Sequence, residues 1–256
     1  MTPEELYRYD LKGYLYMENA IPPDYLKRLN ERLDYWQEKT WPEVEATGKA
    51  AVSVYDIINR DEAFLDLVVN PRVLPYIDEM MEWPRLKTTW IAFKWKGGKT
   101  PGHSSHTPTR MHNFYHFNGG RIHHNLFNMF YALSDVPPGG GGLKLVPGSH
   151  KANYPRPAED ELEDVLVEIP MKAGSVLMLS HDVYHTSLNT TDQVRRVLLY
   201  TYCPGEIANA IEPGDTLYDR LFEKAPEGSW LKYLLRRPNG FKETYPRPQG
   251  RPYDAG

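Results

Sequence analysis

Residues 133–151 read Leu-Ser-Asp-Val-Pro-Pro-Gly-Gly-Gly-Gly-Leu-Lys-Leu-Val-Pro-Gly-Ser-His-Lys, and the fold class can be inferred outward from this segment. A short apolar run, residues 143–146, lies between two turn signals, the glycines of residues 139–142 and the pair Pro147-Gly148. Short apolar runs bounded by glycine and proline are typical of buried β-strands. We interpret the glycine run as a turn, not as a phosphate-binding loop, because it joins two apolar strands.

Further segments on both sides of this one show the same pattern of short aromatic and β-branched runs between turn signals: residues 89–95, 127–133, 165–169, 175–179 and 194–202. The first third of the chain is different, since apolar residues recur there at helical spacing, as in Leu26, Leu29, Leu33 and Trp36. Evenly spaced strands after a helical block predict a jelly-roll or another double-sheet β architecture with helices packed outside.

The chain is expected to form a single domain over residues 1–256 with three parts. Residues 1–88 are predicted to be mainly helical, starting at Thr2, whose side chain can cap a first helix with Glu5 completing a capping box. Residues 89–205 are predicted to form the jelly-roll core. Residues 206–256 are predicted to be a C-terminal extension with short helices and a proline-rich end.

Composition excludes several function classes. The 256 residues carry a net charge of −4, which offers no electrostatic footprint for nucleic acid or for an anionic membrane. Cys203 is the single cysteine, so an internal disulfide framework and a cysteine-rich zinc site are excluded. No apolar stretch approaches the length of a membrane span, and without an export signal we expect a cytoplasmic protein. Phosphate-loop, nucleophile-elbow and zinc-helix motifs are absent from the sequence.

Histidine is the most informative residue type. All 9 histidines lie between His103 and His185, and histidine is the commonest neutral metal ligand. Side chains from strands of a jelly-roll can meet in the barrel mouth. A non-haem iron site there needs two histidines and usually one carboxylate, with open positions left for a co-substrate and oxygen.

The segment 133–151 resembles the Leu-x-Asp…Gly-Gly…Pro-Gly-Ser-His block of the phytanoyl-CoA dioxygenase (PhyH) family. Residues 173–177, together with residues 185–189 and the pair Arg195-Arg196, resemble the second signature of that family. The resemblance covers about residues 90–205. It implies a double-stranded β-helix (a cupin-like jelly-roll) with Fe(II) and 2-oxoglutarate as cofactors.

Carried over residue by residue, the resemblance implies that His185 is the distal metal ligand. Arg196 would pair with the far carboxylate of 2-oxoglutarate, a bidentate contact that suits a planar guanidinium. Ser187, on the same strand face as His185, would add a hydrogen bond to that carboxylate. Arg195 would then alternate to the other face and be a solvated surface charge.

The first metal ligand departs from the family pattern, because no His-x-Asp or His-x-Glu occurs between Trp90 and Leu133. Counting back from the Leu-x-Asp block favours His103, and the carboxylate position then holds Ser105. His116, which keeps a carboxamide two residues later, remains an alternative, and His106, His112 or the absence of a metal remain open as well. The chain is therefore expected to be a variant that lacks the His-x-Asp carboxylate.

Four further residues are candidates for the substrate pocket. Tyr115 and His116 belong to an aromatic segment that could form one wall. Asn125 and Asn128 are polar residues beside or within an apolar strand, and they could point into the barrel.

The resemblance implies an enzyme that oxidises a small organic substrate with iron and 2-oxoglutarate. Two alternatives remain open at this point. A halogenase would place a halide, such as chloride, in the vacant position beside Ser105. A non-catalytic member would use the barrel mouth to bind a small ligand, because a neutral two-histidine site holds a hard cation weakly. Oligomeric state and the identity of the substrate do not follow from the sequence.

Overall fold

Two antiparallel sheets form the centre of the molecule. They are seen in a computed structural model that describes residues 1–104, 115–124, 126–152, 154–205, 207, 218–238 and 246–249. The larger sheet has the strand order β1-β10-β7-β12-β3-β2. Its strands are β1 (Tyr14–Met17), β2 (Ala51–Tyr55), β3 (Pro84–Lys94), β7 (Phe127–Ala132), β10 (Val176–Ser180) and β12 (Arg195–Pro204).

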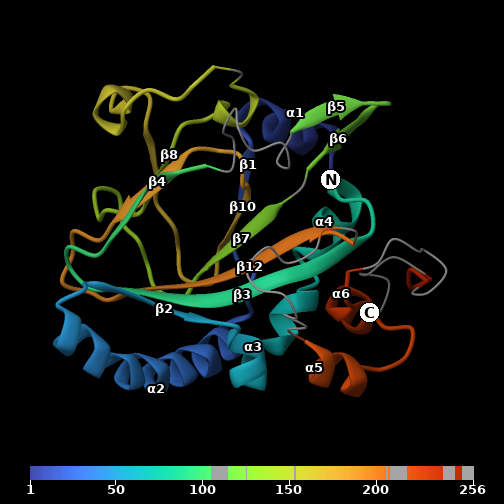
Figure 1. Ribbon diagram of the computed structural model, residues 1–256, viewed down its shortest axis with the longest axis horizontal. Helices are drawn as coiled ribbons and strands as arrows, with labels where there is room; N and C mark the ends of the chain where they lie inside the picture. The colour runs from blue at the N-terminus through green and yellow to red at the C-terminus, as the bar shows by residue number, and fades with distance from the viewer. Residues whose placement is uncertain are drawn as a thin grey trace.

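The smaller sheet faces one side of the larger one and has the order β4-β11-β8-β9. Its strands are β4 (Lys99–His103), β8 (Leu143–Leu145), β9 (Val167–Ile169) and β11 (His185–Leu188). A separate hairpin joins β5 (His116–Asn118) to β6 (Arg121–His123). Two facing antiparallel sheets with helices outside confirm the predicted mainly β, jelly-roll fold (Figure 1).

Alternate side chains of the central strands enter two different cores. On β12, Val197 and Leu199 pack between the two sheets, against Leu143 and Leu145 of β8. Leu198, Tyr200 and Tyr202 point to the opposite face and pack under the helices. Both faces of the large sheet are therefore buried, which is why its central strands are apolar at nearly every position.

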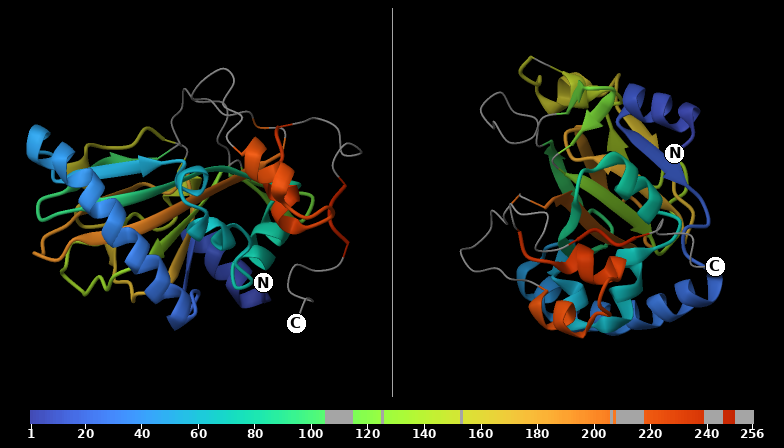
Figure 2. Two further views of the ribbon diagram at one scale, coloured as in Figure 1. Left: turned by 90° about the horizontal axis from the view of Figure 1, so that it is seen from below. Right: turned by 90° about the vertical axis from the view of Figure 1, so that its right-hand side faces the viewer.

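The helices cover the outer face of the large sheet. The long helix α2 (Pro23–Thr47) crosses that face, as Figure 2 shows, and the other helical segments pack beside it. These are α3 (Ile57–Arg60), the 3-10 helix η1 (Glu62–Val69), α4 (Leu74–Met80), α5 (Asp219–Lys224) and α6 (Trp230–Leu235). Two further 3-10 turns, η2 (Ser149–Lys151) and η3 (Glu159–Leu162), lie in the loops of the small sheet. None of the helices in the described ranges is long and apolar enough to cross a membrane.

The N-terminal helix α1 (Pro3–Lys12) begins with the predicted capping box between Thr2 and Glu5. It is bound to the Pro-Gly-Ser-His block: the Nε2 atom of the buried His150 lies 3.0 Å from the carbonyl oxygen of Asp10. The Gly148 amide also donates to the carbonyl of Lys12. The block therefore holds the first helix as well as forming a turn.

The prediction for residues 1–88 was incomplete in one respect. This part of the chain is mainly helical, but it also supplies the first residues of β3 (Pro84–Lys94) and the strands β1 and β2, the two edge strands of the large sheet. Both are short, four and five residues long, and a strand of this length carries too few alternations to be recognised from periodicity alone. They widen the sheet on both sides of the β7–β12 pair that faces the small sheet.

Candidate functional site

His103 and His185 lie side by side at the ends of two neighbouring strands. They are paired residues in the β4–β11 ladder, and their ring centroids are 4.3 Å apart. His185 is buried, whereas His103 is exposed at the edge of the small sheet. The structure thus brings together the two histidines that were expected to be metal ligands, although they are 82 residues apart in the sequence.

Both rings are oriented by the same local hydrogen bond. The Nδ1 atom of His185 lies 2.8 Å from the carbonyl oxygen of Val183, and the Nδ1 atom of His103 lies 2.9 Å from that of Pro101. A carbonyl oxygen only accepts, so each Nδ1 must carry the hydrogen, and in the neutral ring Nε2 is then the nitrogen that keeps its lone pair. A backbone carbonyl on the second ring nitrogen is the usual outer partner of a metal-binding histidine.

The buried position keeps His185 neutral. Burial, and then the neighbouring His103 ring, lower the pKa of His185 to about 3. A neutral imidazole is the form that donates to a metal, so competition from protons at this ligand is weak near neutral pH.

The strand that carries His103 is held in place from outside. Gly102 donates its amide hydrogen to Glu159 over 3.3 Å, and Glu159 also binds Lys99 at 3.2 Å. A β-carbon added at Gly102 would stand 1.6 Å from the Tyr184 hydroxyl, so only glycine fits at this point of β4. The position of His103 is therefore set by a tight contact one residue before it.

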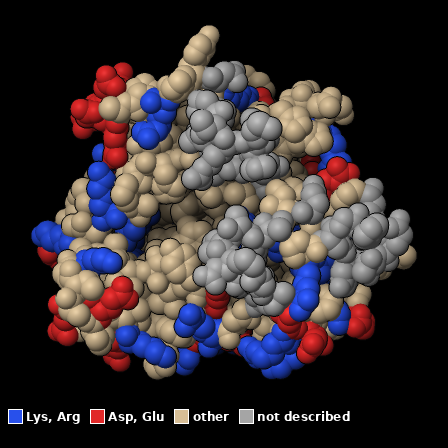
Figure 3. Space-filling model, in the orientation of Figure 1, with Lys and Arg blue, Asp and Glu red and all other residues tan. Residues whose placement is uncertain are grey.

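The histidine pair opens into a cavity of about 370 Å³ between the two sheets. Figure 3 shows a hollow in the middle of the corresponding face of the molecule. Aromatic and aliphatic side chains form most of the wall, including Tyr55, Trp90, Phe130, Val197 and Leu199. Its polar lining includes Asn128, His181 and Ser187 besides the histidine pair. A largely apolar cavity with a few convergent polar groups is the usual form of a small-molecule site.

Two cations, Arg195 and Lys94, also line this cavity. They are paired residues in the β12–β3 ladder, and they are only 6% and 7% exposed. The Lys94 ammonium contacts the hydroxyls of Thr100 and Ser187, while Nε and Nη1 of Arg195 have no hydrogen-bond partner in the described part of the chain. Burial lowers the pKa of Arg195 to about 10, and the pKa of Lys94 falls to about 7 because of burial and the nearby guanidinium.

Buried positive charges normally have a negative partner, because removing a charge from water is costly. Among the described residues that line this cavity there is no aspartate or glutamate. One end of the cavity therefore has the chemistry of a binding site for an anion. Lys94 was not among the predicted site residues, because a lysine near the end of a strand gives no signal that its side chain points inward.

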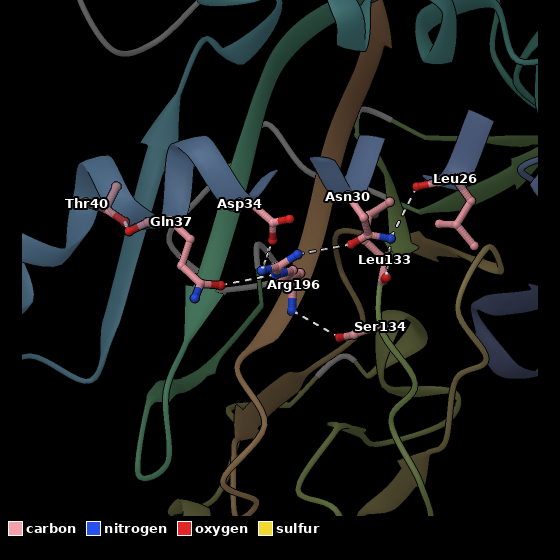
Figure 4. A network of polar contacts seen from close by, with 8 residues as sticks. All are labelled: Leu26, Asn30, Asp34, Gln37, Thr40, Leu133, Ser134 and Arg196. Carbon is pink, nitrogen blue, oxygen red and sulfur yellow. Dashed lines mark hydrogen bonds and ion pairs between the residues drawn. The ribbon is translucent and has the colours of Figure 1, made fainter. Parts of the chain in front are cut away.

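The predicted orientation of the two arginines was wrong. Arg196 points away from the cavity and toward helix α2, as Figure 4 shows. Its guanidinium donates to Asp34 at 2.6 Å, to Gln37 at 3.1 Å and to Asn30 at 3.3 Å. Arg196 thus fastens α2 to the outer face of the sheet, and it is Arg195 that faces the barrel interior.

The physical reason for the reversal is the alternation along β12. Arg195 shares a face with Val197 and Leu199 between the sheets, whereas Arg196 shares a face with Leu198 under the helices. Since both faces of β12 are apolar, the sequence contains no inside–outside pattern from which this register could be read.

The candidate pocket residues divide into two groups. Asn128 lines the cavity, and its side-chain oxygen accepts a hydrogen bond from Thr201 over 2.7 Å. Tyr115 and His116 do not line it. Tyr115 instead packs against His150 and lines a separate hollow beside α1, and His116 stacks on His123 in the β5–β6 hairpin with centroids 4.7 Å apart.

The remaining predicted site residues lie outside the described residues: Ser105, His106, His112 and Asn125. His181 lines the cavity, but within the described ranges no group of three His, Cys, Asp or Glu side chains is placed to hold a metal ion. The described part of the chain therefore brings together a two-histidine pair.

Comparison with a protein family supports this interpretation. The family model described as phytanoyl-CoA dioxygenase (PhyH) matches residues 9–197 of this chain. Among curated proteins, dioxygenase FUM3 of Gibberella moniliformis is 34% identical over 82 residues, which is 32% of this chain. That match spans 26% of the length of FUM3.

Solved structures with the same fold extend the comparison. HygX from Streptomyces hygroscopicus, solved with nickel and 2-oxoglutarate bound, superposes with a TM-score of 0.71 at 18% identity, over 84% of this chain and 91% of HygX. SnoN, a non-haem α-ketoglutarate-dependent epimerase from nogalamycin biosynthesis, gives a TM-score of 0.56 at 20% identity, over 80% of this chain and 85% of SnoN. At these identities the similarity establishes the fold.

Proposed function

This chain belongs to the phytanoyl-CoA dioxygenase family, and on that premise we propose that it is an Fe(II)- and 2-oxoglutarate-dependent oxygenase that oxidises a small organic substrate. The observation that carries the proposal is the buried Arg195 guanidinium, which has unsatisfied donors and no acidic neighbour among the described residues of the cavity wall. A carboxylate of the co-substrate supplies the missing partner, since a guanidinium matches a carboxylate in two parallel hydrogen bonds.

The spacing of the two ends of the site fits a diacid. Ser187, beside the cations, is two residues from His185 along β11, which corresponds to about 7 Å of extended strand. 2-Oxoglutarate carries a keto-acid group at one end and a carboxylate at the other. The keto acid would lie at the histidine pair, and the far carboxylate would lie between Arg195, Lys94 and Ser187.

The histidines fit iron in their chemistry. The Nε2 lone pairs of His103 and His185 are nitrogen donors of the kind that Fe(II) accepts in two-histidine sites. When bound, iron with 2-oxoglutarate and oxygen supplies the oxidising power of the reaction. The residues of this chain hold the rings in place, anchor the co-substrate and exclude water from a cavity with apolar walls.

The substrate proposal is supported by the cavity wall. Trp90 and Tyr55 are adjacent aromatic rings with centroids 6.0 Å apart, and Asn128 adds a carboxamide to the same lining. These groups suit a small, partly apolar molecule with at least one polar group. HygX has been solved with hygromycin B and SnoN with nogalamycin RO, so the same fold accommodates small organic molecules in those proteins.

The direct test is calorimetry of 2-oxoglutarate binding with and without Mn(II), which replaces iron without turnover. We expect measurable affinity that depends on the metal, and release of succinate from 2-oxoglutarate when Fe(II) and oxygen are supplied. Metal-independent binding, or no binding at all, would instead favour the non-catalytic member of the family.

A second candidate function is supported by the missing acid after His103. In a halogenase of this fold a halide would occupy the position beside Ser105, where the sequence has a hydroxyl instead of a carboxylate. We then expect chloride to change 2-oxoglutarate consumption and the spectrum of a bound metal. We also expect the Ser105→Asp variant to lose that chloride dependence while keeping 2-oxoglutarate turnover. Turnover and spectra that are the same in chloride and in acetate buffers would exclude this candidate.

A further inference from the structure

Lys94 is the least expected polar residue of the cavity. It is 7% exposed, it stands opposite Arg195 across the β3–β12 ladder, and its ammonium contacts two hydroxyl groups, those of Thr100 and Ser187. No described carboxylate lines the cavity to balance it. Two potential cations therefore share a buried space whose described lining holds no carboxylate, and Glu168 is the acidic residue close enough to Arg195 for their charges to interact.

The two side chains differ in how they can relieve this repulsion. A guanidinium keeps its proton under all ordinary conditions, whereas an ammonium in a buried position can release one. A neutral Lys94 amine is also well served by its surroundings, since a hydroxyl of Thr100 or Ser187 can donate to it. The geometry thus suits Lys94 in either protonation state.

We propose that Lys94 is a second anchor for the far carboxylate of 2-oxoglutarate, and that it takes up a proton from solvent when this co-substrate binds. The inference rests on the proposed function and adds a form of regulation to it. An amine that is neutral beside Arg195 alone becomes an ammonium once a carboxylate lies between the two residues, because opposite charge favours the protonated form.

Other charged and titratable groups lie around Lys94 on the neighbouring strands. Arg195 faces it from β12, and His185 on β11 lies close enough for their charges to interact. On β4, Lys99 is paired with Glu159 on the outside, and His103 lies at the edge of the sheet. On β2, its ladder partner is Ala51. With metal already bound, the two histidines are held in their neutral form and do not take up the proton.

Because proton uptake and 2-oxoglutarate binding are linked, the pKa of Lys94 decides how the affinity changes with pH. Burial and Arg195 lower the pKa of Lys94 to about 7 in the free protein, and a bound carboxylate raises it again toward its usual range. A group that gains protons on binding strengthens binding at low pH. The affinity for 2-oxoglutarate should therefore fall about 15-fold between pH 7 and pH 8.5, with roughly one proton taken up per co-substrate at the upper end.

The test is isothermal calorimetry of the Mn(II)-saturated protein with 2-oxoglutarate, in buffers of different ionisation enthalpy at pH 7 and pH 8.5. The slope of the observed enthalpy against the buffer enthalpy gives the number of protons taken up. We expect about half a proton at pH 7 and about one at pH 8.5 in the wild type. Lys94→Arg should bind with no proton uptake and with an affinity that does not change over this range, since arginine stays charged.

Two further variants complete the experiment. Lys94→Met should also show no uptake, with weaker binding at pH 7 than the wild type. Lys96→Met is the matched control, because this lysine lies two residues away, is exposed and pairs with Asp192 on the surface; it should behave as the wild type. Uptake that persists in Lys94→Arg would overturn the proposal, and so would binding without uptake in the wild type. A wild type that binds no 2-oxoglutarate at either pH would instead remove the proposed function, and this inference with it.

Discussion

Replacing Arg195 with alanine is expected to weaken metal-dependent binding of 2-oxoglutarate by roughly 30- to 1,000-fold. Truncating one partner of a buried, hydrogen-bonded charge pair costs about 2–4 kcal/mol, and each 1.4 kcal/mol is a factor of ten. The guanidinium is buried and has donors that no described residue satisfies, so neither water nor another side chain can replace it easily. Titration of the Mn(II)-loaded protein with 2-oxoglutarate measures the loss.

Arg196→Ala is the matched control, since it removes the same type of side chain one position further along β12. It should leave the affinity for 2-oxoglutarate within about twofold. It should lower the free energy of unfolding by about 1–3 kcal/mol, because the contacts to Asn30, Asp34 and Gln37 on α2 are lost. Denaturant unfolding measures this second effect. If Arg196→Ala weakened co-substrate binding as much as Arg195→Ala, the assignment of Arg195 as the residue that binds the co-substrate carboxylate would be wrong.

Loss of either histidine should abolish the metal site. We expect His103→Ala and His185→Ala each to weaken Mn(II) binding by more than the roughly 10–100-fold that follows loss of an outer-shell partner, because a direct donor is removed. In a site with only two described protein donors, no third histidine, cysteine or carboxylate in the described ranges can compensate. The measurement is the fraction of free Mn(II) in an electron paramagnetic resonance titration.

His116→Ala is the informative comparison for this experiment. His116 is the rival first ligand, but it stacks on His123 in the β5–β6 hairpin and does not line the cavity. Metal binding should be unchanged in this variant. The opposite result, a metal site that survives His103→Ala and is lost in His116→Ala, would show that the first metal ligand is His116 in the hairpin and not His103 on β4.

Much of the architecture could be predicted from local patterns. The strands β3, β7, β8, β9, β10 and β12 all overlap the apolar segments that lie between glycine and proline turns. The strand β4 was missed, since Lys99–His103 contains a proline and a glycine, which local propensity disfavours. This strand exists because β11 pairs with it, and its glycine is required by the contact with Tyr184.

The histidine pair shows how much of the candidate site could be predicted from the sequence. His103 and His185 were predicted because all histidines lie in one stretch and because the two segments that resemble the family give their positions. In the structure the two rings lie side by side, one on β4 and one on β11. Pairing between strands 82 residues apart cannot be derived from composition. It became predictable because a known family supplies the order of the strands.

The two arginines show which features of the site the sequence determined and which only the tertiary structure decided. The sequence by itself determined the fold class, the family and the presence of an Arg195-Arg196 pair at the start of a strand after the distal histidine. Only the tertiary structure decided which arginine enters the cavity, and it also placed Lys94 beside it. The physical reason is that β12 is buried on both faces, under the helices on one and between the sheets on the other. Alternation along such a strand leaves no polar side to mark the outside, so its register is set by packing with its neighbours.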